Sequence, residues 1–214
     1  MHIIPLFIAL LLVIFSSFQL VQTAYTSSLT YSLSQYSDEA NFGFNEQRIG
    51  NERLLVDMAL SLPNVGAHQY ELAANILSWH SFLRYQNASV EEVNQYLIES
   101  IRLRPTWYAP YLQMSRLSEK HSVPAPIESP EKLATFFGPY MNETKLVLYD
   151  KKFSQWETLS KEEQIALTVN FLVSAQSYRF RRSLQGLLES SKGAERMCKL
   201  LAFNAIDHSS CRKS

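Results

Sequence analysis

The sequence has no Asp, Glu, Lys or Arg in its first 37 positions, and it has only six glycines and two cysteines among 214 residues. Scarce glycine, together with the absence of any useful run that alternates apolar and polar side chains, argues against a β-sheet domain. The formal net charge is zero, so no overall electrostatic attraction to nucleic acid is expected. We therefore predict an all-α protein that does not bind nucleic acid.

The usual signatures of catalysis and metal binding are also missing. The sequence contains no nucleophile elbow, no glycine-rich phosphate loop and no His/Glu zinc motif. His68 and His80 would lie about 120° apart around one helix, too far apart to share a metal. Glu92, Glu99 and Asp150 show no pairing of the kind that glycoside hydrolysis needs. We therefore expect a non-enzymatic protein without catalytic residues, cofactor or metal site.

The uncharged N-terminus is apolar from Ile3 to Phe15, apart from Pro5, and moderately apolar as far as Ala24. A helix that spans a bilayer needs about 20 apolar residues, and this segment reaches that length only if several polar residues are included. Residues 1–24 are either an uncleaved signal anchor, which we favour, or a signal peptide cleaved after Ala24. Gln22 fits poorly two positions before such a cleavage site.

The orientation follows from the flanking charges. The first basic residue after the apolar segment is Arg48, more than twenty residues further on. A flank so poor in Lys and Arg favours translocation, with the N-terminus left in the cytoplasm. The bulk of the protein is therefore expected on the periplasmic or external side.

After the leader, residues 25–45 are rich in Ser, Thr and Tyr without a sustained period, and we interpret them as a linker. Residues 46–214 are expected to form one α-helical domain, in which HSVPAPIESP (121–130) is a boundary loop. The apolar section 165–175 is too short to span a membrane and is expected to lie in the core. Helices are predicted at 46–62, 67–84, 90–104, 107–119, 130–137, 140–149, 161–190 and 194–206.

Residues 50–118 contain two similar helical hairpins. Ser89 and Glu92 form a capping-box pattern at the start of a helix, and Pro105 ends that helix. The apolar positions and the proline recur 42 residues upstream, and the arrangement resembles a degenerate tetratricopeptide repeat, although the period is longer than 34 and the signature Trp and Gly are missing. An ordinary helical domain with a chance spacing of prolines is the alternative. Equivalent positions are Leu55/Leu97, Val56/Ile98, Ala59/Ile101, Pro63/Pro105, Leu72/Met114 and Ala73/Ser115.

Cys198 and Cys211 both lie in the last seventeen residues. On the oxidising side of a membrane, such a pair is typical of a disulfide that closes one short loop. In the cytosol the pair would be reduced or would bind a metal, and two free thiols remain the simpler alternative. A disulfide here would hold the C-terminal tail on the last helix.

One corner between two helices combines guanidinium groups with aromatic rings. Such residues can stack on sugar rings or form part of a protein interface, although they are more often core aromatics with a solvated rim. The cluster RFRR (179–182) could likewise meet acidic polysaccharide or lipid headgroups, or simply be a solvated helix face. The candidate binding residues at the corner are Arg102, Arg104, Trp107, Tyr108 and Tyr111.

The uncharged leader is followed by IRLRPTWYAPYLQMSRL, by FFGPYMNETKLVLYDKKFSQWETLSKEEQ and by the C-terminal cysteine pair. Together these features resemble the VpsP-type accessory proteins of bacterial exopolysaccharide biosynthesis. The resemblance implies a non-enzymatic protein of the inner membrane, single-pass, with its C-terminal domain in the periplasm. It also implies partners such as a polysaccharide polymerase, a ligase or other assembly proteins.

Two functions follow as expectations. The first is a membrane-anchored scaffold that binds other components of the polymerisation and export machinery, because stacked helical hairpins present an extended groove. The second is a periplasmic glycan-binding module that uses Arg102, Arg104, Trp107 and Tyr108 to hold polysaccharide.

Overall fold

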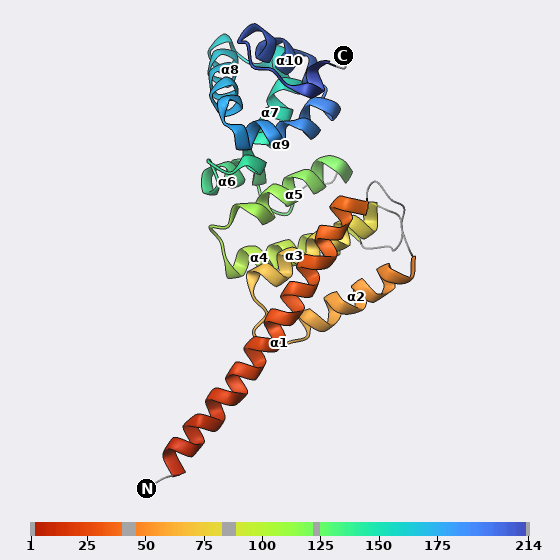
Figure 1. Cartoon of the computed structure of the whole chain (residues 1–214), viewed down its shortest axis with the longest axis vertical. Coiled ribbons are helices and arrows are strands. Elements are labelled where there is room, and N and C mark those ends of the chain that lie inside the picture. Colours follow the sequence, from red (N-terminus) through yellow and green to blue (C-terminus); the bar gives the residue numbers. More distant parts are fainter. Residues whose placement is uncertain (1–2, 40–45, 83–88, 122–124, 213–214) are drawn as a thin grey trace. The chain divides into compact units, whose positions relative to one another are not determined.

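The computed structural model (Figure 1) describes residues 3–39, 46–82, 89–121 and 125–212. These ranges are helical throughout their regular structure and contain no strand, which confirms the all-α prediction. The α-helices are α1 (Ile3–Glu39), α2 (Glu46–Leu60), α3 (Ala67–Phe82), α4 (Val90–Leu103), α5 (Tyr108–His121), α6 (Pro130–Phe137), α7 (Asn142–Ser154), α8 (Lys161–Gln176), α9 (Tyr178–Ser190) and α10 (Ala194–Phe203). Two 3-10 helices are η1 (Trp156–Thr158) and η2 (Ser209–Arg212).

The chain divides into two compact units, Met1–Pro130 and Glu131–Ser214. The predicted boundary loop at 121–130 agrees with this division. The prediction of a single domain over 46–214 does not, because each unit has its own cluster of buried apolar side chains. The helices predicted at 46–62, 67–84, 90–104 and 107–119 correspond to α2–α5, and their ends differ by no more than two residues.

In the first unit, α2 and α3 form one antiparallel hairpin and α4 and α5 form the next (Figure 1). Helix α3 lies between two apolar clusters. Its Ala74 and Leu77 pack with α4 and α5, whereas Leu72, Ala73 and Ile76 pack with α1 and α2. A helix that is apolar on all sides is expected to be buried in this way. Two of the equivalent pairs of the predicted repeat are buried at both positions, Leu72 with Met114 and Ala73 with Ser115, whereas Val56 is buried and its equivalent Ile98 is 39% exposed.

The predicted linker at 25–45 is wrong over residues 25–39, which continue α1 as one helix, while residues 40–45 lie outside the described residues. The reason is tertiary packing. Leu29 is fully buried and Tyr36 is 3% exposed, and both belong to the first unit's interior. Composition alone favours a linker, but burial of this face against α2 and α3 outweighs the weak helix propensity of Ser and Thr.

The hydroxyl groups of this stretch are satisfied within the helix itself. Thr23, Thr26 and Thr30 each donate a hydrogen bond of 2.8 Å to the carbonyl oxygen four residues earlier. Such bonds let Ser and Thr sit inside a helix without an unpaired hydroxyl. A Ser- and Thr-rich segment is therefore compatible with the long helix.

The second unit is built on an aromatic core. Tyr149 and Phe153 of α7 meet Phe171 of α8 and Phe180 of α9, and ring centroids lie 5.1 Å apart for Phe153 and Phe171 and 5.4 Å apart for Tyr149 and Phe171. The Tyr149 hydroxyl donates to the carbonyl oxygen of Asn170 at 2.9 Å, so its polar end is satisfied.

The single helix predicted at 161–190 is divided at Ser177, whose backbone is extended (φ −70°, ψ 126°). The division lets α9 fold back, so that Phe180, Leu184 and Leu188 reach the same cluster as Phe171. The predicted start is confirmed in detail, because Ser160 and Glu163 form both halves of a capping box.

The apolar section of α8 is only partly buried, contrary to the expectation of a core helix. Leu167, Phe171 and Ala175 face the interior. Ile165, Val169 and Val173 lie on another face and are 66%, 54% and 62% exposed. One apolar face of α8 therefore forms part of the unit's core, and the other apolar face is left exposed.

Other helix ends differ from the prediction by several residues. Helix α7 continues to Ser154 instead of ending at 149, because Phe153 is needed in the core. Helix α10 ends at Phe203 instead of 206, since Ala205 has a left-handed backbone (φ 55°). That turn brings the tail back, and a disulfide joins Cys198 to Cys211 with 5.4 Å between their Cα atoms. The predicted pairing of the two cysteines is thus confirmed.

Gly193 directly precedes α10 and lies against Phe153 of α7. A Cβ atom at Gly193 would lie 2.5 Å from the Phe153 Cβ and 2.7 Å from the Phe153 carbonyl carbon. Gly186, in the middle of α9, has no atom within 4 Å of the same position. The two glycines therefore differ in what an added methyl group would meet.

We predict that Gly193→Ala lowers the free energy of unfolding by about 1–3 kcal/mol, because backbone and core side chain must move to admit the methyl group. Gly186→Ala is the matched control and should raise it by about 0.5–1 kcal/mol, as expected for an exposed helix interior. Urea unfolding followed by circular dichroism measures both. Equal effects of the two substitutions would contradict the packing described here.

Candidate functional site

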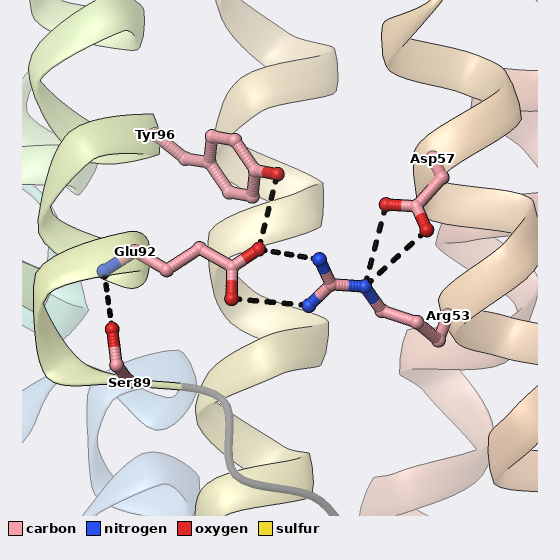
Figure 2. Close-up of polar contacts among 5 residues, drawn as sticks. All are labelled: Arg53, Asp57, Ser89, Glu92 and Tyr96. Carbon is pink, nitrogen blue, oxygen red and sulfur yellow. Dashed lines mark hydrogen bonds and ion pairs between the residues drawn. The ribbon is translucent and has the colours of Figure 1, made fainter.

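A polar network connects the two hairpins of the first unit (Figure 2). Arg53 of α2 directs its guanidinium fork at the carboxylate of Glu92 in α4, with Nη1 donating to Oε2 at 3.1 Å and Nη2 to Oε1 at 2.5 Å. Asp57 lies on the other side of Arg53, 3.3 Å from its Nε atom. Tyr96 donates its hydroxyl hydrogen to Glu92 at 3.3 Å. A forked pair of this kind fixes geometry more narrowly than a single contact.

Glu92 occupies this place because of the local cap. Ser89 accepts a hydrogen bond from the Glu92 backbone N–H at 3.1 Å, which starts α4 as the sequence predicts. The other half of the predicted capping box is different. The Glu92 side chain pairs with Arg53 and Tyr96, because an arginine from the neighbouring hairpin is a stronger partner than the cap's own N–H.

The pairing shifts the ionisation of these groups. The hydrogen bonds from Arg53 hold the pKa of Glu92 below its ordinary value. The hydrogen bonds to Glu92, together with the negative charges of Glu92 and Asp57, raise the pKa of Arg53 above its ordinary value. Burial, with the adjacent Glu92 carboxylate, raises the pKa of the Tyr96 hydroxyl. The shifts of Glu92 and Arg53 favour their charged forms, whereas that of Tyr96 favours its neutral hydroxyl, so Glu92 and Arg53 stay an ion pair at neutral pH.

A second polar cluster lies where α1, α2 and α3 meet. Tyr36 donates its hydroxyl hydrogen to the carboxylate of Glu52, and His80 Nε2 lies 2.9 Å from the Tyr36 hydroxyl and 3.3 Å from Glu52 Oε2. The Tyr36 ring also stacks on Trp79, with centroids 5.6 Å apart. The cluster therefore ties the long N-terminal helix to both helices of the first hairpin.

This cluster is closed to solvent, since Tyr36, Glu52 and His80 are 3%, 4% and 0% exposed. His80 Nε2 faces the carboxylate, which places the ring hydrogen on that nitrogen. His80 Nδ1 is buried without a hydrogen-bond partner among the described residues. The arrangement suits a structural connection between helices, because a substrate could not reach it. Sequence reasoning missed it because Tyr36 lies in the stretch interpreted as a linker.

The predicted binding corner lies between α4 and α5, and its aromatic residues are occupied. The Trp107 Nε1–H donates to Glu71 of α3 at 2.8 Å, and the guanidinium of Arg104 lies over the Trp107 ring, 4.2 Å from its centroid. Trp107 and Tyr108 pack against each other with centroids 5.2 Å apart. Tyr111 is buried and donates to the Pro105 carbonyl oxygen at 2.8 Å. The structure thus places these three aromatics in the packing of the corner.

The two arginines of the corner point outward instead. The Arg102 side chain is 66% exposed and pairs with Glu99 at 2.8 Å. Arg104 is exposed and, within the described part of the chain, its guanidinium contacts Trp107 without an ion pair. The five residues predicted as one binding set therefore separate into buried or half-buried aromatics and exposed cations.

The other predicted cation cluster separates in the same way. In RFRR (179–182), Phe180 is buried while Arg179 and Arg182 are exposed. Among the described residues, no group of three His, Cys, Asp or Glu side chains is arranged to hold a metal ion. The connections between helices are consequently the best-defined polar sites of the chain.

We predict that Glu92→Gln lowers the free energy of unfolding by about 1 kcal/mol at pH 7, the upper end for a partly exposed ion pair. Because the folded-state pKa of Glu92 lies below 4.5, the stabilisation is present above pH 4.5 and is lost as the pH falls through the folded pKa. Urea unfolding at pH 7 and pH 3 should therefore show a larger difference between wild type and variant at pH 7 than at pH 3.

Glu91→Gln is the matched control, since Glu91 shares the first turn of α4 but is exposed. It tests the part of the effect that comes from the helix dipole alone. If both variants lose the same free energy at pH 7, or if the Glu92→Gln loss is undiminished at pH 3, the ion pair does not stabilise the hairpins.

The comparison with known proteins adds no relative. The resemblance to VpsP-type proteins accordingly stays a prediction that rests on the sequence phrases quoted above. No protein-family model, curated protein or solved structure matches this chain.

Proposed function

We propose that the chain is a non-enzymatic, membrane-anchored scaffold of bacterial exopolysaccharide biosynthesis. The observation that carries the proposal is the division of α1 into two parts. Every side chain from Phe7 to Val21 is exposed, whereas Leu29 and Tyr36 lie in the interior of the first unit. One rigid helix thus offers an apolar surface to a membrane and a core surface to the hairpins.

The length of α1 supports the anchor. The described helix over Phe7–Tyr36 is long and apolar enough to cross a membrane. The 19 residues from Ile3 to Val21 rise about 28 Å, close to the hydrocarbon thickness of about 30 Å. Fifteen consecutive exposed, mostly apolar side chains would be costly in water, and a bilayer removes that cost.

Scaffolding is favoured over direct glycan binding by the state of the corner aromatics. A sugar ring stacks on a free aromatic face, but the Trp107 ring is already covered by Arg104 and its N–H is taken by Glu71. Tyr111 is buried. The polysaccharide pathway itself is supported by the resemblance to VpsP-type proteins, which also suggests a polymerase or ligase of the inner membrane as the partner.

We further propose that both compact units lie in the periplasm, which the lack of basic residues before Arg48 supports. The prediction is that Cys198 and Cys211 are oxidised in the native protein. A membrane-permeant maleimide added to intact cells should label neither cysteine before reduction and both after it. Labelling of both cysteines without reduction would contradict the periplasmic orientation.

Cys198→Ser should cost about 3 kcal/mol of unfolding free energy in the loop-entropy model.

The scaffold proposal predicts that the full chain, isolated from its bacterium in mild detergent, carries a membrane-bound polysaccharide polymerase or ligase. The control is a variant in which residues 3–21 are replaced by an unrelated apolar helix of equal length. It should retain the partner, because the hairpins rather than the lipid-facing surface select it. Mass spectrometry of the isolated complexes makes the comparison. Turnover of a sugar substrate by the pure protein, or loss of the partner in the control, would overturn the proposal.

A further inference from the structure

The place where α1 leaves the first unit is defined by two hydrogen bonds. Gln22 Nε2 donates to the carbonyl oxygens of Pro63 and Asn64, at 2.7 and 3.0 Å, in the turn between α2 and α3. One turn later on α1, Thr26 accepts a hydrogen bond from Gln69 at 3.2 Å. The exposed apolar part of α1 ends at Val21, immediately before the first of these contacts. The turn at 61–66 therefore lies level with the end of the apolar part.

The corner between α4 and α5 lies at this same end of the unit. Ser100, in the last turn of α4, donates to the carbonyl oxygen of Ala67 at the start of α3, at 2.9 Å. Trp107 reaches Glu71 one turn further along α3. In Figure 1 the junction of α4 and α5 lies at the left of the hairpins, above the α2–α3 turn. If α1 spans a bilayer, the corner lies at the membrane-facing end of the unit.

The chemistry of the corner suits that position. Arg102 and Arg104 are exposed, and Leu103 between them is 42% exposed. Guanidinium forks match phosphate oxygens, and Trp is favoured at the boundary between headgroups and hydrocarbon. Glu99 offsets part of the charge of Arg102, and Glu71 is taken up by the Trp107 N–H. Of the two arginines of this corner, Arg104 is the one without a carboxylate partner among the described residues.

We propose that this corner, from Arg102 to Trp107, binds the phosphate of anionic phospholipids next to α1. The inference rests on the proposed membrane anchor and adds a second, headgroup contact to it. Arg104 is pre-positioned by its contact with Trp107, and Trp107 is fixed by Glu71, so binding costs little side-chain ordering. Two contacts, one in the hydrocarbon and one at the headgroups, fix the tilt and rotation of the first unit on the membrane.

The test uses the full chain in mild detergent, titrated with short-chain phosphatidylglycerol and short-chain phosphatidylcholine. Wild type should bind phosphatidylglycerol at least tenfold more tightly. Each basic residue near an anionic surface contributes about 1 kcal/mol, so Arg102→Gln with Arg104→Gln should weaken phosphatidylglycerol binding by roughly tenfold or more. Both side chains are exposed, so the fold should be retained, which circular dichroism checks.

The control is Arg179→Gln with Arg182→Gln, which removes the same charge from exposed positions in the second unit. An equal loss in both double variants would mean that total charge alone governs binding, and it would overturn the proposal. So would the absence of any preference for phosphatidylglycerol. Glycerol phosphate serves as a third ligand, and binding as tight as that of the lipid would assign the corner to soluble phosphate instead.

A separate measurement isolates the anchor on which the inference rests. The wild-type protein and the Arg102→Gln, Arg104→Gln variant should both float with phosphatidylcholine vesicles and resist extraction by alkaline carbonate, because α1 is unchanged. Release of both from the vesicles would refute the anchor and, with it, the headgroup contact. Flotation without a lipid preference would refute the headgroup contact alone.

Discussion

The structure depends on one helix that must satisfy two environments. The first part of α1 exposes an uninterrupted apolar surface, and the second part supplies Leu29 and Tyr36 to the interior of the first unit. Because the helix is continuous, nothing flexible separates the two surfaces. The contact of Gln22 with the α2–α3 turn then sets where one surface ends and the other begins. Any membrane in which the first part lies must meet the hairpins at that level.

The hairpins are held together by a central apolar helix and by polar connections at its sides. Burial of α3 on both faces stabilises the first unit, because the removal of apolar area from water is the dominant favourable term in folding. Arg53–Glu92 and Tyr36–Glu52–His80 contribute less free energy, yet each permits only one relative placement of its helices. Polar groups that are satisfied in a single geometry favour one packing register over sliding alternatives.

The sequence was sufficient to predict the fold class and most helix ends, because those features are encoded locally. Pro105 stops α4 through its missing N–H, and Ser160 with Glu163 starts α8 through a cap. Features that depend on distant partners could not be predicted. Residues 25–39 resemble a linker until the face of α2 and α3 that they cover is known, and Ser177 resembles a helix interior until the shared core of α8 and α9 is known.

The candidate site shows the same limit at the level of single side chains. Local spacing correctly paired Ser89 with the start of α4, but it assigned the Glu92 carboxylate to the cap, whereas Arg53 comes from 39 residues away. The binding corner was recognised as a group of arginines and aromatics, but which members face solvent is decided by α3, where Glu71 takes the Trp107 N–H.

The corner thus consists of packed aromatic rings and exposed arginines. A ring whose N–H and one face are already engaged is a poor platform for a sugar but a firm support for the guanidinium above it. Trp107 lies at the end of the unit from which the apolar part of α1 projects. Arg104, which Trp107 positions, is therefore best placed for a ligand that is found at that end. On the proposed anchor, a soluble glycan would have no reason to concentrate at that level, whereas a headgroup phosphate would be held there by the bilayer around α1. One environment would then account for both the apolar surface of α1 and the exposed arginines of the corner.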